Sequence, residues 1–373
     1  MRIAINTRFL LKDKLEGIGW FTFETLKRMV RNHPEVEFHF IFDREYDESF
    51  IFGDNVTPHV LFPPARHPFL WYVWFQFGIP RLLKKIKPDV FLSTDGYLSL
   101  RTKVPTNVVI HDLAFEHHPE DVSGLVSKYY RYFTPRFARF AKRISTVSNY
   151  TKQDISKLYG VDSNLIDVVY NGSNPIYAPL EKSTIDIVKD ELTSGKDYFV
   201  FVGALHPRKN VGRLLQAFDK FKEETESDLK LVMVGRKAWG NESMEKVFQE
   251  MKYSQDVIFT DRLSAERLHQ VLGAAYALTY VPYFEGFGIP LIEAQNCDVP
   301  VITSNRSSMP EVVEGSGLLV DPFDVDSITR ALVNIASSTL LRDELVEKGR
   351  ENRKRFSWEQ SAEKLWDSVC KTI

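Results

Sequence analysis

The chain has 373 residues, enough for two domains, because domains commonly contain about 100–150 residues. Hydrophobic residues make up 43% and charged residues 26%, which is typical of a folded protein and excludes a disordered or collagen-like chain. The net charge of −2 gives no reason to expect a nucleic-acid partner, and the two cysteines exclude a disulfide framework and favour a reducing compartment.

Residues 1–6 are predicted to form a strand directly, without the charged leader and apolar core of a signal peptide. The most apolar stretch, residues 69–77, contains Gln76 and is far shorter than the ~20 residues that a membrane-spanning helix requires. We therefore expect a cytoplasmic protein that can still dock peripherally on the inner face of the cell membrane.

Strand-like runs alternate with amphipathic helix-length stretches along the whole chain. In the first half the sequence predicts a strand at residues 2–6, a helix at 20–31, a strand at 37–42, a helix at 69–85, strands at 89–92 and 107–111, a helix at 124–142 and a strand at 143–147. The second half follows with a strand at 198–202, a helix at 210–223, strands at 230–234 and 257–259, a helix at 265–272, a strand at 277–280, a helix at 288–295 and a strand at 299–303.

This alternation predicts an α/β protein with two Rossmann-like domains, each a parallel sheet with helices on both faces. We assign residues 1–175 to the first domain, 176–197 to a linker region, 198–355 to the second domain, and 356–373 to a C-terminal helix that packs back toward the first domain. Ligands of open α/β sheets bind beyond the carboxyl ends of the strands. Two such domains facing each other across a cleft would place the chemistry in the loops that follow strands.

The two halves of the chain differ in charge. Residues 1–180 carry 23 Lys and Arg against 19 Asp and Glu, a net of +4, whereas residues 181–373 carry 25 against 31, a net of −6. The positive excess is concentrated in residues 81–87 and 128–157. We therefore expect the two domains to bind different partners.

The segment from Glu285 to Glu293 follows a predicted strand and opens a predicted helix. Gly286 and Gly288 allow a ligand to approach the backbone, and the free amides of a first helical turn attract an anion such as a diphosphate. Inside the helix, the Glu293 carboxylate can accept hydrogen bonds from both hydroxyls of a ribose. A glycine-rich turn with two solvated glutamates fits the same pattern.

A second glycine turn, residues 202–210, leaves another predicted strand, with Gly203 at its end. The adjacent cations Arg208 and Lys209 are suited to holding a diphosphate leaving group. The same residues also fit a solvated basic turn.

Two features of the first half lie at the ends of predicted strands. His111 and Asp112 end one strand together, and Gly17 and Gly19 lie in the loop after the first strand. A histidine at a strand end is more often a structural hydrogen-bonding group than a catalyst, and a glycine pair alone is a weak signal.

Taken together, these residues resemble the retaining glycosyltransferases of family 4, also called group 1, which have the GT-B fold. The specific part is Glu285 and Glu293 with seven residues between them, and the resemblance extends over nearly the whole chain. Further matching segments are residues 146–148, 169–172, 299–304, 309–312, 317–322 and 355–358.

The resemblance implies a role for each of these residues. Glu285 would bind hydroxyls of the donor sugar, Glu293 the ribose, and His111 would lie beside the sugar. Arg208 and Lys209 would neutralise the departing diphosphate. The catalytic candidates are His111, Arg208, Lys209 and Glu285, and the donor-binding candidates are Gly17, Gly19, Gly203, Arg262, Gly286, Phe287, Gly288, Ile289, Pro290, Leu291 and Glu293.

The resemblance also implies that the enzyme needs neither a metal nor another cofactor, because the cations and helix amides hold the nucleotide sugar, which is a substrate. Asp324 and Asp326 have the spacing of a metal-binding pair but are predicted to lie at the start of a helix, where Asp is a common cap. Two residues depart from the family pattern by replacing a usual glycine. Asp261 lies near the expected base pocket and leaves the choice of nucleotide open, and Asp298 is interpreted as a variation within a turn.

The first domain of such enzymes binds the acceptor, here a glycan or a lipid-linked glycan. Aromatic and basic residues are interleaved at residues 69–87 and 128–143, which suits an anionic membrane surface. The alternative is that the aromatic residues belong to the hydrophobic core of the domain and that the cations lie in solvent around the edge of this core.

Among nucleotide-sugar donors the sequence favours GDP-mannose, because residues 304–311 look most like the bacterial surface-polysaccharide branch of the family. The alternatives are a non-catalytic sugar-nucleotide-binding protein and another GT-B enzyme such as an epimerase or a phosphorylase. A dinucleotide oxidoreductase is disfavoured, since no G-x-G-x-x-G follows the first predicted strand.

Overall fold

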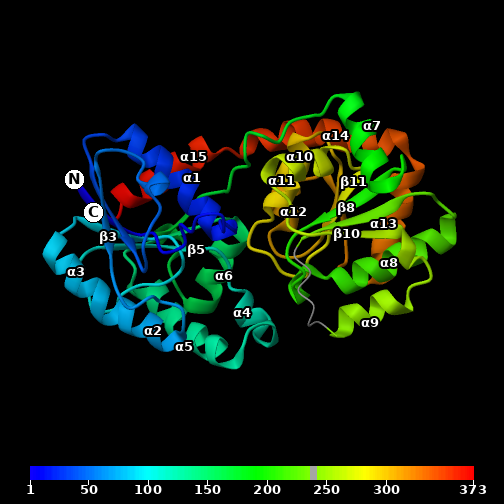
Figure 1. The fold of residues 1–373 in the computed structure, drawn as a ribbon. Coiled ribbons are helices and arrows are strands. Elements are labelled where there is room, and N and C mark those ends of the chain that lie inside the picture. The colour runs from blue at the N-terminus through cyan, green and yellow to red at the C-terminus, as the bar shows by residue number, and fades with distance from the viewer. Residues whose placement is uncertain (236–241) are drawn as a thin grey trace. The chain divides into compact units, whose positions relative to one another are not determined.

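The computed structural model describes residues 1–235 and 242–373 (Figure 1). The chain divides into two compact units. Unit 1 consists of residues 1–172 together with 357–373, and unit 2 consists of residues 173–356.

Unit 1 contains a seven-stranded sheet in the order β3-β2-β1-β4-β5-β6-β7, in which every pair of neighbours is parallel. Its strands are β1 (Arg2–Asn6), β2 (Glu37–Phe42), β3 (Val56–Val60), β4 (Val90–Ser93), β5 (Thr106–Ile110), β6 (Arg143–Thr146) and β7 (Ile166–Val168). The central strands β4 and β5 are buried at every residue, as expected of a parallel sheet covered on both faces.

The helices of unit 1 are α1 (Gly17–Asn32), α2 (Pro68–Val73), α3 (Ile79–Ile86), α4 (Ala114–His117), α5 (Gly124–Phe140), α6 (Asn149–Tyr159) and α15 (Trp358–Cys370). The single helix predicted at residues 69–85 is divided into α2, a π-helical turn at Trp74–Gly78, and α3. Pro80 has no N–H to donate to the carbonyl of Gln76, so the regular α-helical pattern is interrupted there.

Helix α15 completes unit 1, and in Figure 1 it lies beside α1. Buried polar groups join it to the sheet: the Asn107 side chain donates to the Ser368 hydroxyl at 2.8 Å, and the Ser145 hydroxyl is 3.1 Å from the same oxygen. A side chain at Gly172 would lie 2.5 Å from the Trp358 backbone nitrogen, so glycine is required where the two segments of unit 1 meet.

Unit 2 contains a six-stranded parallel sheet in the order β10-β9-β8-β11-β12-β13. Its strands are β8 (Tyr198–Val202), β9 (Lys230–Val234), β10 (Val257–Thr260), β11 (Ala277–Tyr280), β12 (Val301–Ser304) and β13 (Gly317–Val320). Its helices are α7 (Lys182–Thr193), α8 (Val211–Thr225), α9 (Glu242–Glu250), α10 (Ala265–Gly273), α11 (Ile289–Asn296), α12 (Met309–Val313), α13 (Val325–Ser337) and α14 (Thr339–Asn352).

Residues 176–197, predicted as a linker, belong to unit 2. They include the amphipathic helix α7, which buries Val188 and Thr193. The chain leading into α7 packs closely against α10. Leu180 lies so near Gly273 of α10 that a side chain added at Gly273 would be 2.8 Å from it. Polar composition suggested a linker, but the least exposed residues of α7 recur every four positions, which is the spacing of one helix face: Thr184, Ile185, Val188, Lys189, Leu192 and Thr193.

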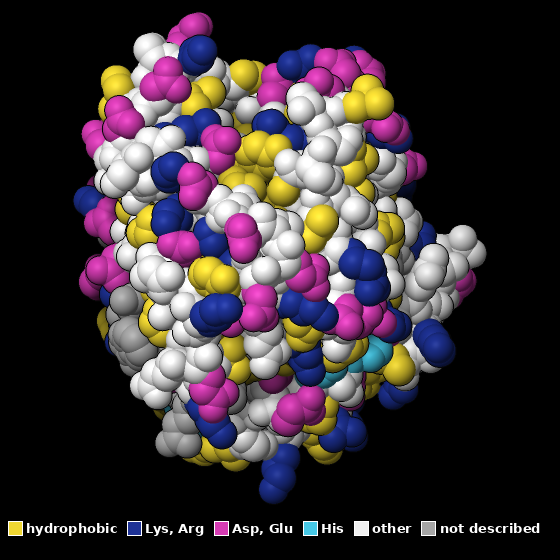
Figure 2. All heavy atoms as spheres, turned by 90° about the vertical axis from the view of Figure 1, so that its right-hand side faces the viewer, with side chains coloured by type: hydrophobic (Ala, Val, Ile, Leu, Met, Phe, Trp, Pro, Cys, Tyr) yellow, Lys and Arg dark blue, Asp and Glu magenta, His cyan; other side chains and the backbone are white. Residues whose placement is uncertain are grey.

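Over the face shown in Figure 2, Lys and Arg side chains alternate with Asp and Glu side chains. None of the helices in the described part of the chain has both the length and the apolar composition needed to cross a membrane.

Candidate active site

The loop after β8 carries two adjacent cations. Gly203 follows the strand with a φ of +152°, and Arg208 and Lys209 lie on the short 3-10 helix Pro207–Lys209 that precedes α8. The next residue, Asn210, adopts a left-handed conformation, and its side chain donates to the Val281 carbonyl at 3.1 Å and to the Pro322 carbonyl at 2.6 Å. These bonds hold the cationic turn against the loop that follows β11.

The loop after β11 carries Glu285, whose backbone is held at both ends. Its amide donates to the Ser307 hydroxyl at 3.1 Å, and its carbonyl accepts from the Ser308 hydroxyl at 2.8 Å. Gly288 then begins helix α11 with a φ of +94°, and a side chain there would lie 2.8 Å from the Met309 methyl carbon. Glycine is therefore required at this turn.

The amides at the start of α11 are only partly available. Pro290 has no N–H, and the Leu291 amide donates to the Gly288 carbonyl at 3.0 Å. Within the segment from Phe287 to Leu291, the amides of Gly288 and Ile289 remain as candidates for binding an anion.

The two loops meet in a cluster of ionised side chains. The Arg208 guanidinium donates to Glu285 Oε2 at 2.6 Å, and the Lys209 ammonium pairs with the same oxygen. The Tyr280 hydroxyl, at the end of β11, donates to Glu285 Oε2 at 3.1 Å and accepts from Lys209. The side chains are 27% exposed for Arg208, 11% for Lys209 and 14% for Glu285, so the cluster lies mostly inside the protein.

The electrostatics of this cluster keep Glu285 ionised. Burial opposes its ionisation, but the Lys209 and Arg208 charges outweigh burial and lower the pKa of Glu285 to about 2. Burial raises the pKa of Tyr280 well above its usual value, so this hydroxyl stays neutral. With two cations and one carboxylate, the cluster has a net charge of +1 and can attract an anion.

Glu293, on the second turn of α11, lies in a different environment. Burial raises the pKa of its carboxyl to about 7, and a hydrogen bond from Tyr177 opposes this rise. Tyr177 itself is 7% exposed and meets the ring of His269 edge-on at 5.9 Å between ring centres. Glu293 is therefore close to half-protonated at neutral pH.

The remaining candidates lie in unit 1. His111 Nε2 is 2.9 Å from the Thr94 carbonyl oxygen, so it is the ring nitrogen that carries the proton, and the Phe21 ring lies edge-on at 5.1 Å. Burial lowers the pKa of His111, which keeps its ring neutral. Gly17 and Gly19 form the first turn of α1, which begins before the predicted start of the helix at residue 20. A side chain at Gly19 would lie 3.0 Å from the Phe9 carbonyl oxygen.

Comparison with known proteins assigns the family. Residues 15–175 match the family model described as Glycosyltransferase Family 4, and residues 183–352 match that described as Glycosyl transferases group 1. The chain is 30% identical over 295 residues to the O-antigen chain mannosyltransferase RfbU of Salmonella typhimurium, with 78% of each chain covered. The chain belongs to the group 1 glycosyltransferases of family 4. This glycosyltransferase is also 27% identical over 282 residues to the O-antigen chain mannosyltransferase B of Escherichia coli, covering 74% of this chain and 73% of that one.

Solved structures share the fold. Anabaena Alr3699/HepE, determined in complex with UDP and glucose, has a TM-score of 0.76 at 15% identity, with 99% of each chain covered. WaaG, a glycosyltransferase involved in lipopolysaccharide biosynthesis, has a TM-score of 0.74 at 16% identity, covering 98% of this chain and 99% of WaaG. These similarities confirm the predicted GT-B fold of two parallel α/β sheets.

The structure of this glycosyltransferase brings some of the predicted residues into contact. Arg208, Lys209 and Glu285 form one cluster through ion pairs, whereas the hydrogen-bond partner of Glu293 is Tyr177. Sequence reasoning missed Tyr280 and Tyr177. A polar side chain at the last position of the apolar strand 277–280 was the available signal for Tyr280, and Tyr177 lay in the presumed linker.

Four other positions discussed in the sequence analysis are exposed, cap a helix or lie in a turn. Arg262 and Asp261 are exposed after β10. Asp324 caps α13, accepting from the Asp326 amide at 2.9 Å, so the predicted capping role is confirmed. Asp298 has a φ of +57°, which explains why glycine is usual there, and its carboxylate pairs with Arg350 at 2.7 Å.

No group of three His, Cys, Asp or Glu residues within 1–235 and 242–373 is arranged to hold a metal ion.

The aromatic residues of the two aromatic and basic stretches, 69–87 and 128–143, divide into a buried group and an exposed group. Trp74, Phe75 and Phe137 are buried in the core of unit 1. Phe69 is 66% exposed and Tyr132 is 54% exposed. Phe77 and Phe140 are also exposed in these two stretches, and the exposed Phe62 and Leu125 lie just before them in the sequence.

Two exposed aromatic rings have an arginine guanidinium stacked over them. The Arg136 guanidinium lies 3.6 Å from the centre of the Tyr132 ring, and that of Arg101 lies 4.3 Å from the centre of the Phe77 ring. Arg143 instead binds Asp167 through two nitrogens at 2.8 and 2.9 Å. The buried aromatic residues fit the interpretation as core, whereas binding of the exposed ones to a membrane surface stays a prediction.

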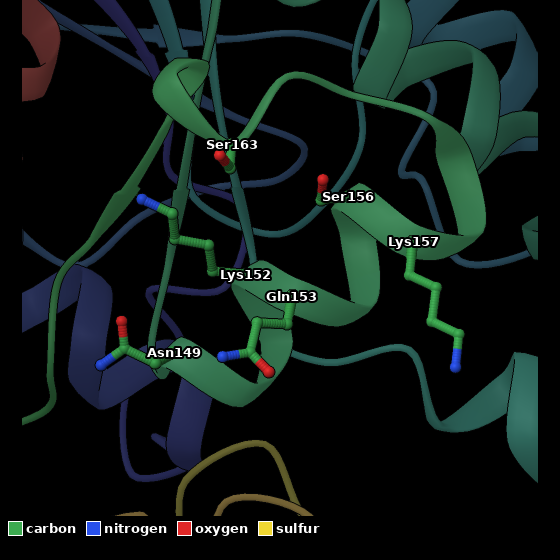
Figure 3. A pocket seen from close by; sticks show the side chains of 6 residues that line it. All are labelled: Asn149, Lys152, Gln153, Ser156, Lys157 and Ser163. Carbon is green, nitrogen blue, oxygen red and sulfur yellow. The ribbon is translucent and has the colours of Figure 1, made fainter.

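A hollow of about 400 Å³ lies beside α6 (Figure 3). Its lining consists of polar residues from α6 and the turn after it: Asn149, Lys152, Gln153, Ser156, Lys157 and Ser163. Figure 3 shows the side chains of Lys152 and Lys157 directed away from each other, so they do not converge on one ligand position.

Proposed function

We propose that this enzyme is a retaining mannosyltransferase of surface-polysaccharide synthesis. It moves mannose from a nucleoside diphosphate sugar, GDP-mannose, to a glycan or lipid-linked glycan acceptor. The observation that carries the proposal is the cluster in which Arg208 and Lys209 meet the ionised Glu285 at the carboxyl end of the unit 2 sheet. Support for mannose comes from the two mannosyltransferases of Salmonella and E. coli with which the chain shares 30% and 27% identity.

In this proposal the two cations act on the leaving group. When the donor binds, its diphosphate shares Arg208 and Lys209 with Glu285, and the Gly288 and Ile289 amides add hydrogen-bond donors. As the bond from the sugar to the phosphate breaks, negative charge grows on the phosphate oxygens, where preorganised cations stabilise it most. These groups supply the charge stabilisation without a metal ion.

Glu285 acts on the sugar. Its carboxylate stays ionised, so it can accept hydrogen bonds from donor-sugar hydroxyls and favour the positive charge that develops on the ring. The acceptor hydroxyl attacks from the face that the diphosphate leaves, a phosphate oxygen takes its proton, and the anomeric configuration is retained. His111 serves as a neutral group beside the sugar.

For unit 1 we propose docking of the acceptor and of an anionic membrane surface at the inner face of the cytoplasmic membrane. Support comes from the exposed Phe69 and Tyr132 and from the exposed cations Arg81, Lys84 and Lys128. Cations near such a surface contribute about 1 kcal/mol each, and screening by salt weakens this attraction.

Vesicle co-sedimentation tests the docking. Wild-type protein should sediment with anionic vesicles at low salt and less at high salt, and Arg81→Gln/Lys84→Gln/Lys128→Gln should sediment less. The matched control is Lys220→Gln/Lys348→Gln/Lys354→Gln, which removes three charges from exposed positions of unit 2. Equal losses in both variants, or no sedimentation of wild type, would remove the docking proposal.

Donor and mechanism are tested together on the purified protein. Binding of GDP, UDP and ADP is compared first, and transfer from GDP-mannose to a mannose-containing glycan is then followed by mass spectrometry in excess chelator. The proton-carbon coupling of the new anomeric centre reports the configuration. We expect GDP to bind best and an α-mannoside to form from α-linked donor. A β-linked product would contradict retention, and a dependence of turnover on added Mg²⁺ or Mn²⁺ would contradict metal independence.

A further inference from the structure

The Tyr280 hydroxyl occupies a central place in the ion cluster. It donates to Glu285 Oε2 at 3.1 Å and accepts a hydrogen bond from the Lys209 ammonium, which also lies 4.9 Å from the centre of the Tyr280 ring. The ring is 1% exposed and stacks against Phe201 at 6.1 Å between ring centres. Tyr280 is thus fixed by the core and touches two of the residues assigned to the reaction.

All three side-chain donors to Glu285 use the same oxygen. Arg208, Lys209 and Tyr280 bind Oε2, and within the described residues no group donates to Oε1. The backbone of Glu285 is held separately by the Ser307 and Ser308 hydroxyls. The carboxylate therefore has one occupied oxygen and one oxygen with its acceptor positions open to a ligand.

The three donors differ in what a bound diphosphate would do to them. Arg208 and Lys209 are cations, so a diphosphate competes with Glu285 for their hydrogen bonds. Tyr280 is neutral and buried, and a phosphate has no comparable charge attraction for it. Of the three, the Tyr280 hydroxyl is the one that continues to hold Oε2 when the cations turn to the diphosphate.

We propose that Tyr280 is a positioning residue of this transferase, whose hydroxyl orients Glu285 so that Oε1 faces the donor sugar throughout the reaction. The inference rests on the proposed function, in which Glu285 acts on sugar hydroxyls. The ligand that Oε1 receives is a hydroxyl group of the hexose. Tyr280 makes no contact with the reacting atoms and acts through Glu285 and Lys209.

The test compares Tyr280→Phe with the matched control Tyr198→Phe. Tyr198 is also a fully buried tyrosine of the unit 2 sheet, and its hydroxyl makes one hydrogen bond, to the Val271 carbonyl at 2.6 Å. Each substitution removes one buried hydroxyl and keeps the ring, so similar losses of thermal stability are expected. A purely structural role predicts that the two variants also behave alike in catalysis.

We expect Tyr280→Phe to lower kcat by roughly 10- to 100-fold, on the scale of a lost preorganised donor at an active site. The KM for the donor and the Kd for GDP should change by less than about 3-fold, because Glu285 acts mainly on the sugar. Tyr198→Phe should keep kcat within about 2-fold of wild type. A kcat of Tyr280→Phe near that of wild type, or equal losses in both variants, would overturn the inference.

Crystal structures of the two variants give a readout that does not depend on the donor. In Tyr280→Phe the Glu285 carboxylate should turn or adopt more than one rotamer, whereas in Tyr198→Phe it should stay in place. An unmoved Glu285 in Tyr280→Phe would contradict the positioning role even if wild type proved inactive with mannosyl donors. Inactivity of wild type with every nucleotide sugar would instead contradict the proposed function.

Discussion

Glu285 and Glu293 lie at the two ends of one short segment, yet their carboxyl groups differ by about five pKa units, at about 2 and about 7. Both are withdrawn from water, which by itself raises the pKa of a carboxyl group. Glu285 has Lys209 and Arg208 beside it, whereas a neutral hydroxyl, that of Tyr177, is the partner of Glu293. The comparison shows that the charge of the partner, more than burial, determines the ionisation of each glutamate.

Replacing Glu285 should have the largest effect. Glu285→Gln is expected to lower kcat by about 10²–10³-fold or more, because the sugar loses its ionised partner. The resemblance implied that Glu285 binds hydroxyls of the donor sugar, and its ion pairs with Arg208 and Lys209 add a second consequence. Without the carboxylate, Arg208 and Lys209 are released to the diphosphate, so GDP should bind as tightly as to wild type or more tightly. Calorimetry of GDP binding checks this, and weaker binding would show that Glu285 is needed to hold the cations in place.

Replacing the cations should remove the difference between the two glutamates. In Arg208→Gln/Lys209→Met the pKa of Glu285 should rise toward that of Glu293, and transition-state stabilisation should fall by about 2–5 kcal/mol. Steady-state kinetics should show the loss in kcat more than in the KM for the acceptor. The control is Lys220→Met, which removes a solvent-exposed cation of the same unit. A double variant with normal kcat would contradict the leaving-group role.

Replacing Glu293 should have a smaller effect than replacing Glu285 or the two cations, and this effect should be on GDP binding. Glu293→Gln is expected to weaken GDP binding by about 1–3 kcal/mol, the range for a lost hydrogen bond to a charged group. The effect on kcat at saturating donor should be small, since the ribose is remote from the reacting bond. Titration of GDP into both proteins measures the difference. Equal affinities would show that Glu293 does not bind the ribose.

The mildest test changes only pH. A carboxyl whose pKa is raised from 4.5 to about 7 binds more protons in the folded protein than in the unfolded one between these values. Ionising it therefore lowers the free energy of unfolding as pH rises through this interval, by on the order of 3 kcal/mol once the pH exceeds the folded pKa. Glu293→Gln removes this penalty, so its melting temperature should exceed that of wild type at pH 8 and approach it at pH 5.

Tyr177→Phe sharpens the same measurement. Removing the hydroxyl that opposes the effect of burial should raise the pKa of Glu293 further, so the stability loss should be displaced to higher pH. A difference between wild type and Glu293→Gln that stays constant from pH 5 to pH 8 would show that Glu293 does not titrate in this range.

Much of the fold was predictable because the central strands are continuous apolar runs. The strands missed by sequence reasoning are marginal in composition or length. Strand β3 contains Pro58, which an edge strand tolerates because it needs fewer ladder hydrogen bonds, and β7 has three residues. Strand β13 begins at Gly317 and leaves Leu319 46% exposed, so its pattern is weak.

The candidate site was predictable where chemistry depends on residue type and spacing, as for Arg208, Lys209 and Glu285. It was not predictable where a contact depends on packing. The Tyr280 hydroxyl lies in a strand whose other residues are apolar, so its sequence context indicates core. The shared use of Glu285 Oε2 depends on how two loops far apart in the sequence meet, which residue spacing does not specify.

The return of α15 to unit 1 has a consequence for synthesis of the chain on the ribosome. Unit 2 is one continuous segment, whereas the last part of unit 1 is made only after all of unit 2. Until then Asn107 and Ser145 lack the Ser368 partner that they have in the complete protein. The second unit can therefore complete its structure before the first, although the first is made earlier. A nascent chain that stops before residue 357 lacks these hydrogen bonds, although Asn107 and Ser145 still bond to each other, and its unit 1 is expected to be more sensitive to proteolysis than its unit 2.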